Sequence, residues 1–187
     1  SQHSMDPSGL FALWPGWRVI VPTTPFDYIG LFNSAVNCDD PVVIIETQTL
    51  FQDEGPVPAG DLDYCIPFGK GRIVRPGSAC TVIGCGNMVP IAVEAVEKCG
   101  IDAEVIDPRT LDSDSLDWEM ISESVKRTNR LLVAEQTARG PSLGASIVQE
   151  GQERLFDYLD HQILRVSGSH SASYLEGFGR GGARRCG

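Results

Sequence analysis

CTVIGCGNMVPIAVEAVEKCGIDAEVID, residues 80–107, contains a complete strand–helix–strand unit. Residues 80–84 and 103–106 are mostly apolar and rich in β-branched side chains, so each predicts a strand. Between them, Asn87 is expected to cap a helix that ends at Gly100, because asparagine favours the N-cap and glycine favours the left-handed position after a helix. The inward face of that helix would carry Val89, Ala92, Val93 and Val96, with Glu94, Glu97 and Lys98 opposite.

The residues that follow repeat this alternation. Strands are predicted over 131–134 and 163–166, and helices over 115–126 and 143–159. The inward positions of the first helix would be Leu116, Met120, Ile121 and Val125. Alternation at this spacing predicts an α/β fold with a mostly parallel sheet and right-handed crossovers.

Residues 1–50 resemble the end of another α/β domain. A strand is predicted over 18–21, followed by a helix that has Thr24 as N-cap and Pro25 as first residue. The run 42–46 is apolar up to its last residue and predicts a strand buried on both faces. Residues 51–70 are rich in Gly, Pro and acidic residues, which indicates an interdomain linker before a second domain over 71–176. Residues 177–187 lack apolar periodicity and are expected to be disordered.

The composition narrows the class of partner. The chain has 187 residues, 42% of them hydrophobic, and a net charge of −10, so it can form a packed core but carries the wrong charge for nucleic acid or an anionic membrane. No apolar run approaches the roughly 20 residues that cross a bilayer. An acidic surface could instead receive a basic protein module.

The six cysteines favour a reducing compartment. None forms a C-x-x-C pair, and their spacing matches neither a structural zinc site nor a small disulfide scaffold. We expect free thiols that act mostly as small core hydrophobes, with Cys80, Cys85 and Cys99 in apolar strands or helices.

The turn over residues 84–89 allows two interpretations. Its glycines follow a strand and open a helix, as in a dinucleotide-binding fingerprint, and Glu104 and Asp107 lie near the place of a ribose-binding acid. Val89 replaces the third glycine, however, which favours a tight turn whose glycines serve only backbone geometry.

Residues 140–144 match G-x-S-x-G, and Asp157, Asp160, His161 and His170 follow in hydrolase order. A nucleophile elbow needs the strand to run directly into the serine, whereas here the strand is predicted to end near Glu135. Ser142 is therefore interpreted as a helix N-terminal residue.

The acidic residues before position 70 show no spacing typical of a calcium loop or a helical carboxylate pair. We interpret them as solvated linker charges, with the first of them ending a strand: Glu46, Asp53, Glu54, Asp61 and Asp63. No metal-binding residue is predicted.

Six segments occur in an order that resembles one family. They are QHS at 2–4, PGWRVIVPTTP at 15–25, DPVVIIE at 40–46, IPFGKG at 66–71, EVIDPRTL at 104–111 and FDYLD at 156–160. The succession is similar to the β subunit of the thiamine-diphosphate-dependent 2-oxoacid dehydrogenases, a family that includes pyruvate, branched-chain and acetoin-cleaving enzymes. The resemblance covers residues 1 to about 176 and implies the end of a pyrimidine-binding domain followed by a transketolase-type C-terminal domain.

The resemblance also implies roles. His3 would face the active-site channel and handle protons or orient intermediates during decarboxylation and acyl transfer to lipoamide, a task that suits imidazole near neutral pH. The cofactors would be thiamine diphosphate and Mg²⁺, neither held by this chain, because the glutamate-bearing half and the α subunit's metal segment are missing. The partners would be the α subunit of an α2β2 assembly and the subunit-binding domain of a lipoyl acyltransferase core.

The chain departs from the family in two further places, a cation-binding stretch and the end of the resemblance. Some members bind a structural cation where this chain has Asn37-Cys38-Asp39-Asp40, and a thiol is a poor ligand for a hard cation. The resemblance also stops near Glu176, where relatives add a closing helix. We expect a C-terminal fragment, inactive alone, from a cytoplasmic bacterial enzyme rather than from the mitochondrial matrix. The open alternatives are a non-catalytic assembly module with the same fold and a nucleotide-binding α/β domain.

Overall fold

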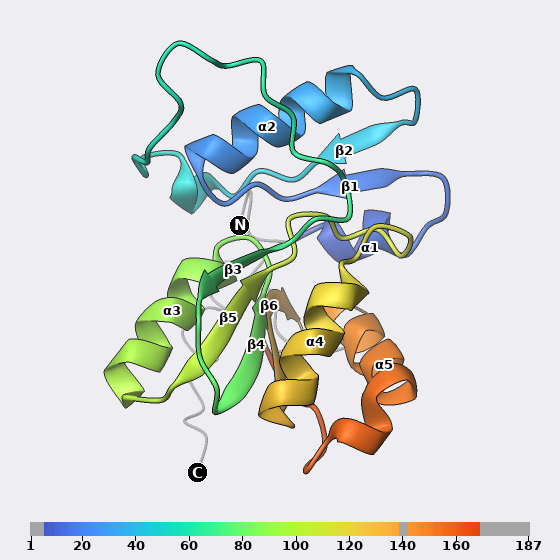
Figure 1. The fold of residues 1–187 in the computed structure, drawn as a ribbon. Helices are drawn as coiled ribbons and strands as arrows, with labels where there is room; N and C mark the ends of the chain where they lie inside the picture. Colours follow the sequence, from blue (N-terminus) through green and yellow to red (C-terminus); the bar gives the residue numbers. More distant parts are fainter. Residues whose placement is uncertain (1–5, 139–141, 169–187) are drawn as a thin grey trace, which may run out of the picture.

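The computed structural model describes residues 6–138 and 142–168 and contains two sheets (Figure 1). The larger sheet has the strand order β3-β5-β4-β6-β7, formed by Arg72–Arg75, Ala103–Asp107, Cys80–Gly84, Leu131–Ala138 and Leu164–Gly168. All its neighbouring strands are parallel except the edge pair β3 and β5. The predicted α/β fold with a mostly parallel sheet is therefore confirmed.

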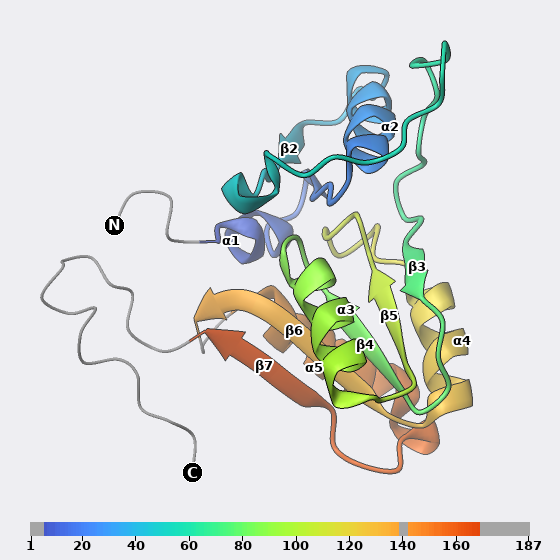
Figure 2. The same ribbon diagram turned by 90° about the vertical axis from the view of Figure 1, so that its left-hand side faces the viewer.

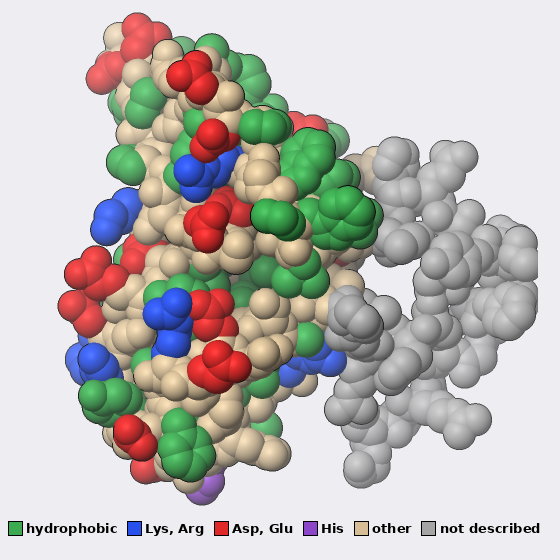
Figure 3. Space-filling model, turned by 90° about the vertical axis from the view of Figure 1, so that its right-hand side faces the viewer, with side chains coloured by type: hydrophobic (Ala, Val, Ile, Leu, Met, Phe, Trp, Pro, Cys, Tyr) green, Lys and Arg blue, Asp and Glu red, His purple; other side chains and the backbone are tan. Residues whose placement is uncertain are grey.

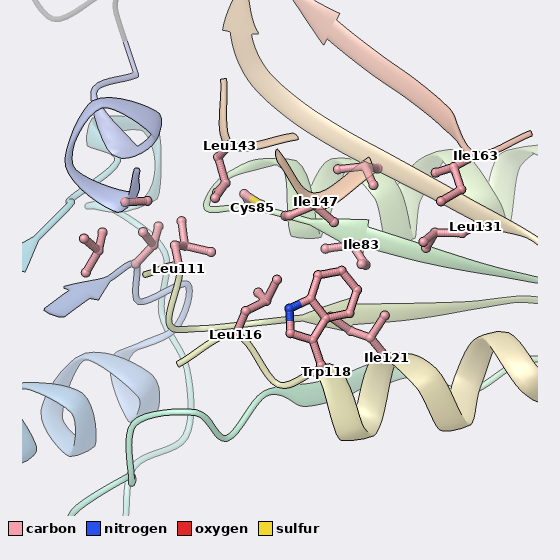
Figure 4. Packing of buried hydrophobic residues seen from close by; sticks show 14 of the residues in the cluster. Ile83, Cys85, Leu111, Leu116, Trp118, Ile121, Leu131, Leu143, Ile147 and Ile163 are labelled. Atoms are coloured by element: carbon pink, nitrogen blue, oxygen red, sulfur yellow. The ribbon is translucent and has the colours of Figure 1, made fainter. Parts of the chain in front are cut away.

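Helices cover both faces of this sheet, and together they form what we call the C-terminal unit, residues 71–168. Helix α3 (Met88–Cys99) covers one face, while α4 (Trp118–Thr128) and α5 (Leu143–Leu155) cover the other (Figures 1 and 2). The core on the α4–α5 side includes Ile83 and Leu131 from the strands and Ile121 and Ile147 from the helices, around Trp118 (Figure 4). Burying each such side chain contributes about 1.5–3 kcal/mol.

The β4–α3 unit follows the prediction in outline. Strand β4 has the predicted bounds, Val89, Ala92 and Val96 are buried, and Gly100 closes the helix with φ = 64°. The predicted capping by Asn87 is wrong, because its backbone is helical and its side chain makes no cap hydrogen bond. The reason is local: the Met88 and Val89 amides already donate to the carbonyls of Cys85 and Gly86 in the turn.

Element boundaries differ elsewhere in the C-terminal unit. Helix α4 begins at Trp118 rather than at 115, because the Asp117 carboxylate accepts the Met120 amide at 3.1 Å and caps the helix there. Strand β6 continues to Ala138, well past the predicted end near Glu135, because it keeps pairing with β7 beyond an irregularity in register. Helix α5 ends at Leu155 and is followed by a 3-10 turn, η2 (Phe156–Tyr158).

The second sheet belongs to the N-terminal unit, residues 6–50. Its strands β1 (Arg18–Ile20) and β2 (Val42–Ile44) are parallel and connected by α2 (Pro25–Val36), while a short helix α1 (Ser8–Ala12) precedes them and a 3-10 turn η1 (Gln48–Leu50) follows. Thr24 caps α2 as predicted, because its hydroxyl accepts the Asp27 amide. The prediction that 42–46 is a fully buried strand is wrong: β2 is shorter and half-buried, since among the described residues it pairs only with β1.

The segment between the units, residues 51–70, lacks helices and strands, but part of it is docked on α2; we call residues 62–66 the strap. The Asn33 amide donates to the carbonyls of Leu62 and Tyr64 at 2.6 and 2.9 Å. The Tyr64 ring stacks on Phe26 with ring centroids 4.6 Å apart. The strap therefore fixes one end of the connection against the N-terminal unit.

The cysteines only partly match the prediction. The five in the described part of the chain are free thiols, but Cys85 alone among them is buried, whereas Cys65 and Cys99 are exposed. Cys99 is exposed because it follows the outward-facing Glu97 and Lys98 at the end of α3. In the same part of the chain, no helix has the length and apolar character needed to cross a membrane.

Candidate functional site: a cleft between the two units

The strand order creates a crevice above the larger sheet. From β4 the chain goes to β5 on one side and then crosses to β6 on the other, so the winding direction reverses at β4. Ligands of open α/β sheets bind outside the carboxyl ends of the strands at such a reversal. A cavity of about 490 Å³ lies at this place.

Both units line this cavity, which we call the cleft. The C-terminal unit contributes the turn after β4, a later loop residue and β6 through Cys85, Gly86, Asn87, Leu111 and Gln136. The N-terminal unit contributes the ends of β1 and β2 and the start of α1, through Val21, Asp6, Pro7, Ser8 and residues 44–49, and Phe51 completes the wall. The cleft therefore exists only while the two units stay together.

The polar groups of the cleft are amides, hydroxyls and two carboxylates. Asp6 is held in place because its carboxylate accepts the Ser8 amide at 2.9 Å and the Thr137 hydroxyl at 3.2 Å. Glu46 is exposed and hydrogen-bonds Tyr28, which raises the pKa of that phenol. Among the described residues that line the cleft, there is no Lys, Arg or His.

Cys85 is a neutral thiol in this environment. Its burial, and next the negative charge of Asp6, raise the pKa of the thiol. Because the thiolate is the reactive form of cysteine, this side chain is suited to packing and not to nucleophilic attack. Among the sequence-based expectations for the cysteines, this one is confirmed.

The turn after β4 serves backbone geometry, as the favoured interpretation of its glycines predicts. A Cβ at Gly84 would lie 2.9 Å from the backbone nitrogen of Val89, and Gly86 has φ = 57°. Neither candidate ribose acid is free: Glu104 pairs with Arg127 at 2.6 Å, and Asp107 belongs to the ion cluster described below.

Ser142 is the N-cap of α5 and not an exposed nucleophile. Its hydroxyl accepts the Ala145 amide at 3.2 Å and donates to the buried Glu135 carboxylate at 2.8 Å. Glu135 also accepts the Gly144 amide at 2.8 Å, and a Cβ at Gly144 would meet this carboxylate. The G-x-S-x-G spacing thus reflects a helix start built around a buried carboxylate.

A buried ion cluster joins the two units, and no sequence motif predicted it. We define it as Thr23, Asp27, Arg72, Asp107 and Arg109. Asp27, fully buried on α2, accepts from Arg109 Nε at 2.8 Å and pairs with Arg72 Nη2 at 3.2 Å. Asp107, at the end of β5, accepts the Thr23 hydroxyl and lies 3.5 Å from Arg72 Nη2. A usable signal was present, because Asp27 shares the inward face of α2 with Gly30 and Leu31.

Burial dominates the titration of Asp107. Desolvation raises the pKa of this carboxyl to about 6, although the Thr23 hydrogen bond opposes the shift. Backbone bonds reinforce the same junction: Val21 N–H donates to the Arg109 carbonyl at 2.8 Å, and Leu111 N–H to the Val19 carbonyl at 2.9 Å. Arg109 adopts φ = 60° between these contacts.

The remaining predicted site residues lie elsewhere. His3 and His170 lie outside the described residues. The linker carboxylates Asp53, Glu54, Asp61 and Asp63 are exposed, and Asp40 pairs with Arg18 at 2.9 Å. Among residues 6–138 and 142–168, no group of three or more His, Cys, Asp or Glu side chains could hold a metal ion.

Comparisons with known proteins agree with this two-part arrangement. Residues 69–176 match the family model of the transketolase C-terminal domain, and residues 1–53 match that of the transketolase pyrimidine binding domain. A solved structure described as a split gene transketolase, inactive beta4 tetramer, aligns with a TM-score of 0.66 at 24% identity, over 92% of this chain and 55% of that one.

Curated relatives are dehydrogenase or oxidoreductase β subunits. The chain is 36% identical over 181 residues to the 2-oxoisovalerate dehydrogenase subunit beta of Pseudomonas aeruginosa, covering 89% of this chain and 51% of that protein. It is 39% identical over 171 residues to the pyruvate dehydrogenase E1 component subunit beta of Rickettsia conorii, covering 90% and 51%. It is 36% identical over 174 residues to the acetoin:2,6-dichlorophenolindophenol oxidoreductase subunit beta of Bacillus subtilis, covering 91% and 50%. The chain thus spans about half the length of the curated relatives it matches.

Proposed function

The chain belongs to the transketolase C-terminal domain family, and from this membership we propose that it is part of the β subunit of a thiamine-diphosphate-dependent dehydrogenase. The reaction would be decarboxylation of a 2-oxoacid, or cleavage of acetoin, followed by acyl transfer to lipoamide. The observation that supports this most strongly is the match of both transketolase models in order along one chain whose relatives include 2-oxoacid dehydrogenase β subunits. In this proposal residues 1–50 end the pyrimidine-binding domain, 51–70 link it, and 71–176 form the C-terminal domain.

His3 is the proposed catalytic residue. Asp6, three positions along the chain, lines the cleft, which supports the proposed role of His3. An imidazole near its ordinary pKa exchanges protons efficiently at neutral pH, as general acid–base chemistry in such a channel requires. The cleft's amides and hydroxyls would position polar parts of the substrate, and its apolar side chains would contact the apolar parts.

The described residues do not fit the cofactor itself. A diphosphate group favours cationic side chains, whereas the charged side chains lining the cleft are the carboxylates of Asp6 and Glu46. Mg²⁺ needs a set of oxygen ligands, and the described residues contain no group of three or more His, Cys, Asp or Glu side chains that could hold a metal ion. We therefore propose that thiamine diphosphate and Mg²⁺ are held by other polypeptide, and we assign no step through them to this chain.

The proposed partners follow the same logic. An α subunit would complete the catalytic assembly, and the acidic surface, with a net charge of −10, would favour a basic subunit-binding domain of an acyltransferase core. Nucleic acid and membranes are not proposed as partners. A cytoplasmic location is proposed from the free thiols and from the bacterial relatives.

Reconstitution tests the proposal. The complete open reading frame, co-expressed with an α subunit, should decarboxylate pyruvate or a branched-chain 2-oxoacid, or cleave acetoin, in the presence of thiamine diphosphate and Mg²⁺. His3→Ala should lower kcat about 10²–10⁴-fold, the range for loss of a general acid or base. His161→Ala is the matched control, because His161 is exposed on a loop before β7.

Each negative result has a separate meaning. Assembly with the α subunit but no effect of His3→Ala would support the non-catalytic module instead. No turnover of any of the three substrate classes by the assembled complex would refute the proposed reaction. The isolated 187-residue chain should show no micromolar binding of thiamine diphosphate with Mg²⁺ by titration calorimetry, and such binding would contradict the cofactor assignment.

A further inference from the structure

The ion cluster is built so that two carboxylates compete for the same donors. Oδ2 of Asp27 lies 3.2 Å from the Thr23 hydroxyl oxygen, and Oδ2 of Asp107 accepts a hydrogen bond from that same hydroxyl. A threonine hydroxyl has one proton and can donate it to only one of them. Arg72 Nη2 is likewise shared, at 3.2 Å from Asp27 and 3.5 Å from Asp107.

The two carboxylates are not equivalent. Asp27 also accepts from Arg109 Nε at 2.8 Å and from the Thr24 hydroxyl at 2.6 Å, so its charge is well compensated. Asp107 has the long Arg72 contact, the Thr23 hydroxyl and the Arg109 backbone amide at 3.0 Å. When two buried carboxylates approach each other, the one with fewer donors takes up a proton first.

The cluster also connects elements that no strand ladder joins. Thr23 and Asp27 belong to the N-terminal unit, whereas Arg72, Asp107 and Arg109 belong to the C-terminal unit. We propose that this cluster is a proton-operated latch, which holds the N-terminal unit more tightly against the C-terminal unit when Asp107 carries a proton. The cleft lies between the same two units, so the latch would determine how long its walls stay together.

The direction of the pH effect follows from linkage. Burial, with Asp27 nearby, raises the pKa of Asp107 to about 6 in the closed latch. In an opened latch the carboxyl would be solvated, with an ordinary pKa near 3.9. The closed state thus binds the proton more tightly, so the latch is strongest below about pH 4, weakens as the pH rises to about 6, and stays constant above that.

A phenol and a thiol near the latch stay neutral in this window. Tyr64 of the strap is close enough to Asp27 for its charge to raise the pKa of the phenol, after the larger effect of burial. Cys85, from the turn after β4, has its thiol pKa raised mainly by burial. Both stay neutral between pH 4 and 7, because burial moves their pKa values further above this range, and the change in charge is assigned to Asp107.

Hydrogen exchange on the complete chain tests the latch. Val21 N–H donates across the two units to the Arg109 carbonyl, so amides of residues 18–36 report on its opening. After correction for intrinsic exchange rates, their protection relative to β4 should fall about 25-fold between pH 4.5 and 7.5, as follows from pKa values of about 6 in the closed latch and about 3.9 in the open one. Asp107→Asn, a neutral isostere, should remove this dependence, whereas Asp102→Asn, at an exposed carboxylate outside the cluster, should retain it.

A second measurement works on the unchanged chain. The carboxyl carbon of Asp107, followed by NMR from pH 4 to 8, should titrate with a midpoint near 6. A midpoint at or below 4 overturns the proposal. So does wild-type protection of residues 18–36 that is independent of pH, or an Asp107→Asn variant that keeps the wild-type dependence. Neither experiment depends on the proposed enzyme activity.

Discussion

The N-terminal and C-terminal units bury their apolar side chains to different degrees. The C-terminal unit buries the central strands β4 and β5 of its five-stranded sheet between its own helices, while Leu164 and Val166 of the edge strand β7 are exposed. The N-terminal unit has a two-stranded sheet, and an isolated sheet of this size is at best marginally stable. The C-terminal unit is stabilised by packing among its own elements, whereas the stability of the N-terminal unit depends on contacts outside its small sheet.

Exposed apolar side chains mark the same difference. Seven large ones lie within residues 6–50, and a further seven lie within the much longer stretch 71–168. In the N-terminal unit they form a group around α1 (Leu10, Leu13, Trp14 and Trp17) and a stripe along α2 (Tyr28, Phe32 and Val36). Figure 3 shows hydrophobic side chains concentrated in the upper half of one face, over this unit. Patches of this kind are typical of protein–protein contacts.

The largest expected effect comes from removing the charge that joins the units. Asp27→Ala leaves Arg72 and Arg109 without their shared carboxylate, and breaking a buried ion pair from one side costs about 3–5 kcal/mol. Residues 18–36 should lose protection against hydrogen exchange while residues 80–84 keep theirs. Uniform loss of protection in both units would show that they fold as one cooperative body.

A core substitution in the C-terminal unit should lower the stability of that unit. Ile121→Ala removes a fully buried side chain between α4 and the sheet and should cost about 2–4 kcal/mol in urea denaturation. The transition followed through Trp118, which belongs to the same cluster, should shift to lower urea. Phe32→Ala, at an exposed position on α2, is the control and should change the free energy of unfolding by less than about 0.5 kcal/mol.

Helix capping gives a smaller effect that distinguishes two similar sequence signals. Thr24→Ala removes the hydroxyl that accepts the Asp27 amide and donates to the Asp27 carboxylate, and should cost about 1–2 kcal/mol in thermal or urea denaturation. Asn87→Ala should cost much less, because Asn87 makes no cap bond. Equal losses at the two positions would contradict the assigned geometry of the α3 start.

Substitution of an exposed aromatic residue near α1 should have the smallest effect on stability but a clear effect on self-association of the chain. Trp14→Ser removes an exposed aromatic side chain next to α1 and should leave the free energy of unfolding within about 0.5 kcal/mol of wild type. We expect the wild-type chain to self-associate through the exposed group around α1, so sedimentation velocity should show less self-association for the variant. Ile101→Ser, at an exposed apolar position of the C-terminal unit, should leave the association unchanged.

The fold was predictable where the spacing of apolar residues agrees with the residues that begin or end a helix or strand. Strand β4 and the end of α3 at Gly100 follow from an apolar run and a left-handed glycine, both of which act over a few residues. Boundaries set by partners were missed. Strand β6 is extended by its pairing with β7, and α4 starts late because Asp117 accepts the Met120 amide.

The candidate site was harder to predict from the sequence than the fold. His3 came from a family motif and stays a prediction, because it lies outside the described residues. Asp27 and Asp107 were within quoted or periodic segments, yet their pairing with arginines from the opposite unit spans 82 positions between Asp27 and Arg109. Single-residue chemistry does not indicate which distant partner a buried carboxylate will find.

The sequence by itself determined the α/β class, most of the strands and helices, and the family, because apolar periodicity and ordered motifs are local properties of the chain. Only the tertiary structure decided that β2 is half-buried, that residues 62–66 are docked on α2, and that two carboxylates and two guanidinium groups meet between the units. The physical reason is that burial and desolvation depend on neighbours distant in sequence, and these set both the cost of a charge and the strength of its pairing.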